Sequence, residues 1–204
     1  MRKQSIIICA ILFCCAKLIG QTYEYDVLVF GKKIGTVIAQ RTVEGDEVTY
    51  TSNSKSEVSF FGKKTILTKM KTIYKNDILN YSFYEVKKNG KIKEKSVINS
   101  KNGNYIIDTD GKTTVHDAPV KLSTIMLTYY KPKNGDKVFE EVGGYYKEIK
   151  QVNANTFDLI SPESRHKDSY IYNEVGVLEQ CIVRKTLFNF KMILRDTESL
   201  TAKK

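Results

Sequence analysis

Four side chains of the sequence could take part in nucleophilic or acid–base chemistry: Ser123, Cys181 and the two histidines, His116 and His166. His116 precedes Asp117, so these two could form an acid–base pair, with Ser123 or Cys181 as the nucleophile. A catalytic triad requires three groups that converge in space, and nothing in their spacing indicates this. We expect His116 to stabilise a turn or lie exposed, and His166 to lie in a solvated loop. We expect Cys181, in an apolar strand, to be a buried structural thiol.

The same residues make a poor metal site. Zinc sites of proteins use pairs of His or Cys ligands at close spacing, and the segments around His116, His166 and Cys181 contain no such pair. The sequence therefore predicts no catalytic residue, no metal ligand and no cofactor. An enzyme is the least favoured class of function.

The first twenty residues have the build of a secretory signal peptide. Arg2 and Lys3 precede the apolar run 5–16, and Gly20 is a small residue before the polar Gln21. The run is shorter than the roughly 20 residues of a membrane span, so cleavage is favoured over anchoring. We expect a signal peptide over 1–20, a single domain over 21–204 without a transmembrane span, and a periplasmic or secreted location.

Cysteine usage agrees with this boundary. Cys9, Cys14 and Cys15 lie in the signal segment, so the mature chain keeps only Cys181 and cannot form an internal disulfide. Lipid attachment at Cys14 or Cys15 is a weaker alternative, because neither follows a small residue. A packed core must therefore stabilise the mature domain.

The chain is strongly basic, with a formal net charge of +10. Outside the cytoplasm, such a charge favours anionic lipid headgroups, lipopolysaccharide or acidic glycans over nucleic acid as partners. The lysines of 87–95 concentrate this charge at one hairpin tip. Alternating lysines usually mark the solvated face of a strand, so a surface that keeps the protein soluble is the simpler interpretation. A contact with lipid headgroups is the more specific alternative.

Most of the chain alternates apolar and polar residues with a period of two, which is typical of antiparallel strands with one buried face. The pairs Asn89-Gly90, Asn102-Gly103 and Asp110-Gly111 supply the two positive φ angles of a type I′ hairpin turn. The fold class is therefore mainly β. We expect a single curved antiparallel meander sheet, or a partly open barrel, because long twisted sheets curl to protect their edges.

One segment departs from this period. Its apolar residues recur at i, i+3, i+4 and i+7, which predicts one short amphipathic helix over about residues 120–130 that ends before Pro132. We expect its apolar stripe to pack on the sheet, with Ser123 and Thr124 turned away. The stripe consists of Leu122, Ile125, Met126 and Tyr129.

Three stretches, 25–35, 117–131 and 172–178, resemble landmarks of exported bacterial β-rich families known only as domains of unknown function. These families are similar in layout to lipocalin-like and lipoprotein-carrier half-barrels. The resemblance implies a curved sheet that holds a helix against its apolar face, and a binding role toward apolar ligands or the cell envelope. The commoner pattern has Arg after the aromatic pair, where this chain has Lys131.

Two functions are open at this point. The first is an exported, non-enzymatic binding protein that holds a lipid-like or anionic amphipathic ligand in the curved sheet. The second is a structural or interaction protein of the cell envelope, with a self-filled core and a protein partner. A cavity of about a few hundred Å³ would favour the first function. Its predicted ligand-binding residues are Leu122, Ile125, Met126, Tyr129, Tyr130 and Lys131.

Overall fold

The computed structural model describes residues 19–59, 62–162, 164, 166–184 and 189–195. Within these residues the chain forms fourteen strands and one short 3₁₀ segment. The elements are β1 (Ile19–Val29), β2 (Lys32–Glu44), β3 (Glu47–Val58), β4 (Lys64–Lys75), β5 (Ile78–Lys88), β6 (Lys91–Lys101), β7 (Asn104–Thr109), β8 (Lys112–His116), η1 (Thr124–Thr128), β9 (Lys137–Glu140), β10 (Tyr145–Gln151), β11 (Thr156–Ile160), β12 (Lys167–Tyr172), β13 (Leu178–Arg184) and β14 (Asn189–Leu194).

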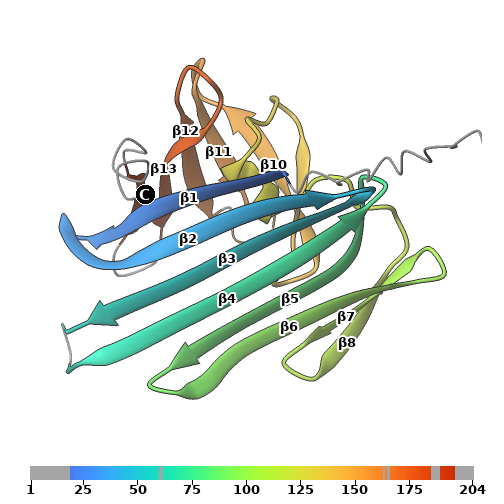
Figure 1. Ribbon diagram of the computed structural model, residues 1–204, viewed down its shortest axis with the longest axis horizontal. Coiled ribbons are helices and arrows are strands. Elements are labelled where there is room, and N and C mark those ends of the chain that lie inside the picture. The colour runs from blue at the N-terminus through green and yellow to red at the C-terminus, as the bar shows by residue number, and fades with distance from the viewer. Residues whose placement is uncertain (1–18, 60–61, 163, 165, 185–188, 196–204) are drawn as a thin grey trace, which may run out of the picture.

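All fourteen strands belong to one antiparallel sheet, which confirms the mainly β prediction. Its order is β8-β7-β6-β5-β4-β3-β2-β1-β14-β13-β12-β11-β10-β9. Strands that follow one another in the chain lie side by side, and β1 pairs with β14 to join the two halves. Figure 1 shows β1 to β8 as one twisted layer with β10 to β13 behind it. The sheet is not closed, because β8 and β9 are its two edges.

The predicted hairpin turns are confirmed by their backbone angles. Asn89 and Gly90 have φ of 50° and 79°, and the Asn102-Gly103 and Asp110-Gly111 turns have the same positive signs. These angles match the right-handed twist of the strands that each turn connects. Local sequence therefore fixes the register of the β5–β6, β6–β7 and β7–β8 hairpins.

The interior contains two clusters of buried side chains. One lies between β1, β2 and β10 to β13 and includes Tyr25, Phe157 and Tyr172. The other lies over β3 to β7 and includes Tyr50, Tyr74 and Phe139. The segment around η1 contributes to both, because Leu127 packs in the first cluster and Ile125 in the second.

The predicted helix over 120–130 is wrong. Only Thr124–Thr128 is helical, as a five-residue 3₁₀ turn. The residues before it are extended, because strands satisfy their carbonyl groups: Leu79 N donates to Val120 O, and Phe139 N donates to Leu122 O, each at 2.9 Å. The β-branched residues Thr124, Ile125 and Thr128 also lower the helix propensity of the segment.

The predicted orientation of this segment is also wrong. Ser123 was expected to face away from the sheet, but its exposed fraction is 0%, as is that of Leu127. Side chains pack against it from both halves of the sheet, so it has no solvated face of the kind that an amphipathic helix needs. The apolar spacing reflects burial on two sides, which periodicity cannot distinguish from a single stripe.

The predicted signal peptide, 1–20, lies almost wholly outside the described residues, and β1 begins at Ile19. No helix in the described part of the chain has the length and the hydropathy that a membrane span needs.

Candidate functional site

A small cavity of about 80 Å³ lies between the inner face of β2 to β4 and the η1 segment. Its walls include strands that are far from η1 in the sequence. Antiparallel pairing brings these strands together. Aromatic and charged side chains predominate among its lining residues, which are Arg41, Val48, Tyr50, Tyr74, Asp77, Lys121, Met126 and Tyr130.

Arg41 is the most unusual residue of this cavity. It follows Val37 and Ala39 in the β2 alternation, and both of these are buried on the inner face. Its Nη1 donates to Gln21 Oε1 at 3.3 Å, and its Cζ lies 5.8 Å from the centroid of the Tyr130 ring. Its Nε is buried and has no hydrogen-bond partner among the described residues. The guanidinium lies close enough to the Tyr50 and Tyr130 hydroxyls to interact with both, but its Nε makes no well-formed hydrogen bond to either.

Tyrosine hydroxyl groups surround this guanidinium. Tyr50 donates to the Tyr130 hydroxyl at 3.3 Å, and the Tyr129 ring lies 5.5 Å from the Tyr50 and Tyr23 rings. The Tyr129 hydroxyl is buried, again with no partner in the described part of the chain. Burial raises the pKa of both Tyr50 and Tyr129, so these phenols stay neutral at physiological pH. The Tyr129 hydroxyl can donate to an anion, whereas the Tyr50 hydroxyl already donates to Tyr130.

Glu141 positions η1 at the cavity. Its carboxylate accepts hydrogen bonds from Thr124 N and Ile125 N, each at 3.2 Å, and from the Thr124 hydroxyl. Ser123 stands at the N-cap of η1 but makes no capping bond with its side chain, so Glu141 supplies the acceptor from a distant part of the chain. The Glu141 side chain is fully buried, and this burial raises its pKa.

Ser123 has a structural role here. Its hydroxyl accepts a hydrogen bond from Tyr74 OH at 2.8 Å, and both groups are buried. Together with the Glu141 bonds, this contact fixes the first turn of η1 against β4. Met126 and Tyr130, which follow on the chain, are thereby held at the cavity.

The structure separates the six predicted ligand-binding residues. Met126 and Tyr130 line the cavity, and Tyr129 adjoins it through Tyr50. Leu122 and Ile125 pack into the two core clusters. Lys131 lies elsewhere, because its Nζ donates to Asn155 Oδ1 at 2.8 Å and sits over the Phe157 ring.

Sequence reasoning missed Arg41 and Tyr50. The signal was present, because Arg41 occupies an inward position of a strand whose other inward residues are Val37 and Ala39. A charge at such a position departs from the binary pattern of the strand. The contacts of Tyr50 with Tyr129 and Tyr130, just after η1, depend on the tertiary fold, and no local pattern encodes them.

His116, Cys181 and His166, first considered for catalysis, do not line this cavity. His116 is not exposed as expected, because its ring packs 5.5 Å from both the Phe139 and Tyr146 rings. Cys181 is buried as predicted, and burial raises the pKa of its thiol to about 12, which makes it a poor nucleophile at neutral pH. His166 contacts the Arg184 carbonyl oxygen. Within the described residues, no three His, Cys, Asp or Glu side chains gather at a potential metal site.

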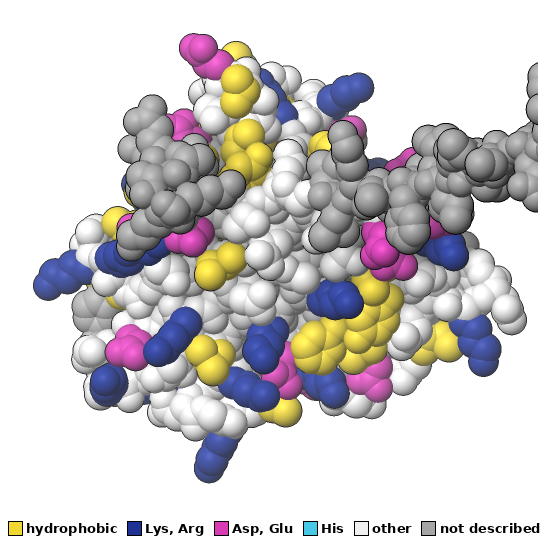
Figure 2. Space-filling view, viewed as in Figure 1, with side chains coloured by type: hydrophobic (Ala, Val, Ile, Leu, Met, Phe, Trp, Pro, Cys, Tyr) yellow, Lys and Arg dark blue, Asp and Glu magenta, His cyan; other side chains and the backbone are white. Residues whose placement is uncertain are grey.

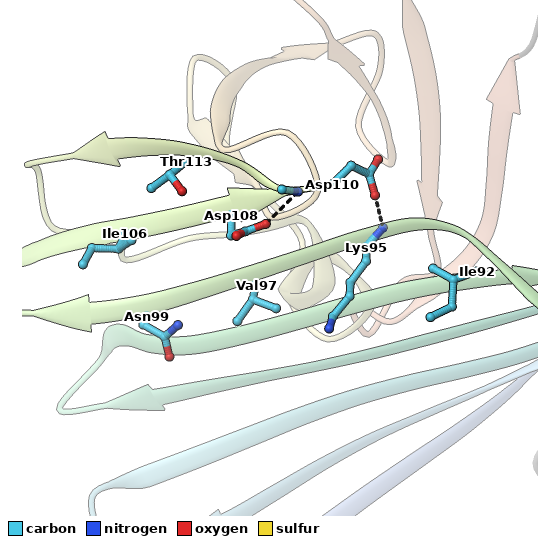
Figure 3. Close-up of a pocket in the computed structure, with 9 residues that line it drawn as sticks. Ile92, Lys95, Val97, Asn99, Ile106, Asp108, Asp110 and Thr113 are labelled. Carbon is cyan, nitrogen blue, oxygen red and sulfur yellow. Dashed lines mark hydrogen bonds between the residues drawn. The ribbon is translucent and has the colours of Figure 1, made fainter.

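A larger hollow lies on the opposite, outer face of the sheet. It is an open groove of about 580 Å³ over β6, β7 and β8 (Figure 3). Val97 and Ile106 are among its apolar lining residues, and Lys95 and Asp108 are among its charged ones. Asp108 Oδ1 accepts from Gly111 N of the β7–β8 turn, and Asp110 Oδ1 accepts from Lys95 N of β6, so both carboxylates are bound to backbone amides.

Among solved structures, one similar chain agrees with the fold. No protein with a curated description matches the sequence. The crystal structure of a beta-barrel-like protein of the DUF1849 family from Brucella abortus is similar with a TM-score of 0.58 and 8% identity, over 88% of this chain and 97% of that one. A DUF1089 family protein from Pseudomonas aeruginosa gives a TM-score of 0.41 and 12% identity, over 70% of this chain and 87% of that one. Residues 25–195 match the model of a family described as a domain of unknown function, DUF6134, and the chain belongs to that family.

Proposed function

We propose that this chain is an exported, non-enzymatic binding protein that holds the acidic head group of an amphipathic molecule in the Arg41 cavity. The observation that carries the proposal is a buried donor of a residue that lines the cavity, Arg41 Nε, which has no partner among the described residues; the Tyr129 hydroxyl, next to the lining residue Tyr50, is a second such donor. Buried donors in proteins are almost always hydrogen-bonded, and an unsatisfied one calls for an explanation. An acceptor that carries negative charge fits a site whose unused donors include a guanidinium.

The size of the cavity limits what enters it. A volume of about 80 Å³ is far below the few hundred Å³ expected of a site that encloses a whole ligand. It has room for roughly two or three water molecules, or for one carboxylate or phosphate group. An apolar tail would therefore leave the cavity past Val48 and Met126, which are its aliphatic lining residues.

The proposal predicts that the parent protein binds dodecanoate below its micellar concentration, measured by isothermal titration calorimetry. Arg41→Met should weaken this binding by about tenfold to a hundredfold, because a hydrogen bond to a charged group contributes roughly 1.5–3 kcal/mol. Lys150→Met removes one exposed cation from β10 and serves as the matched control, with no change expected.

Two results would contradict the proposal. One is equal affinity for dodecanoate and dodecylammonium, since the site would then not recognise negative charge. The other is an equal loss of dodecanoate binding in Arg41→Met and Lys150→Met, since only general electrostatics would then be at work. Inorganic phosphate and acetate, titrated alone, test whether the head group binds without a tail.

A self-filled structural or interaction protein is the second candidate, and the burial of Ile125 and Leu127 in the two clusters favours it. If the core is filled, Ile125→Ala should lower the free energy of unfolding by about 2–5 kcal/mol. If η1 instead covers a ligand site, the loss in the unliganded protein should stay within about 1 kcal/mol. Thermal melts measure the difference. A large loss, combined with no dodecanoate binding by the parent, would select the second candidate.

A further inference from the structure

The outer face of β4 to β8 carries a continuous set of apolar side chains, here called the outer band. Residues directly opposed in a sheet share one face, and the strand register opposes Ile73 to Tyr81, Phe83 to Val97, and Ile106 to Val115. Their chain neighbours Thr72, Ser82, Ile98 and Ile107 are buried on the inner face. The outer band therefore consists of Ile73, Tyr81, Phe83, Val97, Ile106 and Val115.

The outer band is accessible. Val115 is 67% exposed and Ile106 37% exposed, while the other four residues are partly buried by one another and by their neighbours. The groove over β6 to β8 forms one end of the band (Figure 3). Figure 2 shows a hydrophobic area over the middle strands of this face, with Lys and Arg side chains and some Asp and Glu side chains around it. Contiguous exposed apolar patches with a polar rim mark interaction sites.

The rim of the band is mainly cationic. Lys69 and Lys71 of β4 and Lys95 of β6 are exposed on the same face, and they form no ion pair among the described residues. Three acids also lie on this face: Glu85 pairs with Lys87 at 3.0 Å, while Asp108 and Asp110 accept hydrogen bonds from backbone amides and keep their charge. The hairpin tip beside them adds Lys88, Lys91 and Lys93.

We propose that the outer band docks on an anionic lipid membrane surface. Aromatic and aliphatic side chains enter the boundary between headgroups and acyl chains, and the lysine rim meets the phosphate groups. The five strands of this face span roughly 20 Å at about 4.8 Å per strand, which gives a broad footprint on the twisted sheet. The contact uses the face opposite the Arg41 cavity, so it does not depend on the proposed ligand.

Charge selects the lipid surface over a second copy of this chain. A two-fold interface places the same patch on both partners. Lys69, Lys71 and Lys95 of one copy would then lie close to the same lysines of the other, and the three carboxylates on this face, Glu85, Asp108 and Asp110, are fewer than the lysines of the rim and the hairpin tip. Anionic headgroups supply the opposite charge over the whole footprint.

Sedimentation of the full chain with vesicles tests the proposal. Vesicles of equal parts phosphatidylglycerol and phosphatidylcholine should bind the protein, and vesicles of phosphatidylcholine alone should not. Binding should fall in salt of about 1 M, where the Debye length is about 3 Å. Lys69→Glu combined with Lys71→Glu should weaken binding by at least about tenfold. Phe83→Ser should weaken it without removing its salt dependence.

The matched control combines Lys137→Glu with Lys150→Glu, which makes the same change of charge on β9 and β10. This variant should bind nearly as well as the parent, and Arg41→Met should bind equally well. Circular dichroism melts confirm that each variant is folded. Equal losses in the two double variants, binding to phosphatidylcholine alone, or no binding to either vesicle would overturn the proposal. A concentration-dependent dimer that Phe83→Ser dissociates would show instead that a second copy covers the band.

Discussion

Phe139→Ala is expected to lower the free energy of unfolding by about 3–5 kcal/mol, the range for removing a buried phenylalanine. Phe139 lies on β9, one edge of the sheet, and is fully buried. Its ring lies 5.5 Å from His116, which ends β8 at the other edge, and 5.3 Å from Tyr146. The substitution leaves a cavity at the place where side chains, and no backbone ladder, bring the two edges together.

Urea denaturation followed by circular dichroism measures this loss. Val175→Ala is the control, because Val175 is 83% exposed and an exposed substitution usually changes stability by no more than about 0.5 kcal/mol. A loss below about 1 kcal/mol in Phe139→Ala would mean that the contact between the edges does not stabilise the fold.

The strands and hairpins were predictable because their determinants are local. One inner and one outer face impose a period of two, and Asn-Gly or Asp-Gly at a turn supplies the required positive φ angles, as Asn89 and Gly90 show. A meander needs no further information, since each strand pairs with the next. The pairing of β1 with β14 is different, because it joins the first and last described strands of the chain and so the two halves of the sheet. No short segment of the sequence encodes it.

The 3₁₀ segment was mispredicted because two core clusters bury it from two sides. Ile125 meets the cluster over β3 to β7, and Leu127 meets the cluster on β10 to β13. Residues buried alternately by two surfaces can imitate a helical stripe. The residues just before the 3₁₀ segment are extended. The backbone amides of Leu79 and Phe139, on strands before and after this segment, donate hydrogen bonds to their carbonyl groups. Tertiary contacts therefore override the local pattern.

The candidate site was half predictable for the same reason. Met126 and Tyr130 were found because they belong to the segment that interrupts the period of two. Arg41 was identifiable as a charge on the inner face of a strand. Glu141, however, follows a four-residue strand in a sequence with ordinary surface composition, and nothing local indicates that it is fully buried. Its role depends on the packing of the 141–144 turn: Ser96 Oγ donates to the Glu141 carbonyl oxygen at 3.2 Å.

Glu141→Ala should cost about 3–5 kcal/mol of stability. The substitution leaves Thr124 N and Ile125 N without their acceptor, and each unsatisfied buried group costs roughly 1–3 kcal/mol. Glu141→Gln keeps the shape and one amide oxygen as acceptor, so its cost at low pH should be smaller. Chemical denaturation of the parent and both variants measures these losses. A cost below about 1 kcal/mol for Glu141→Ala would show that the carboxyl group does not hold η1.

The pH dependence of the Glu141→Gln effect tests the protonation state of this carboxyl group. Burial raises its pKa in the folded protein above the ordinary value of 4.5, so between these two pKa values the folded state retains a proton that the unfolded state has released. The contribution of Glu141 to stability is therefore full below pH 4.5 and falls as pH rises through the folded-state pKa. The glutamine variant cannot titrate at this position, and its deficit relative to the parent should shrink over the same range. A deficit that grows with pH would instead mean that the hydrogen bonds from Thr124 and Ile125 outweigh burial and hold the carboxylate ionised.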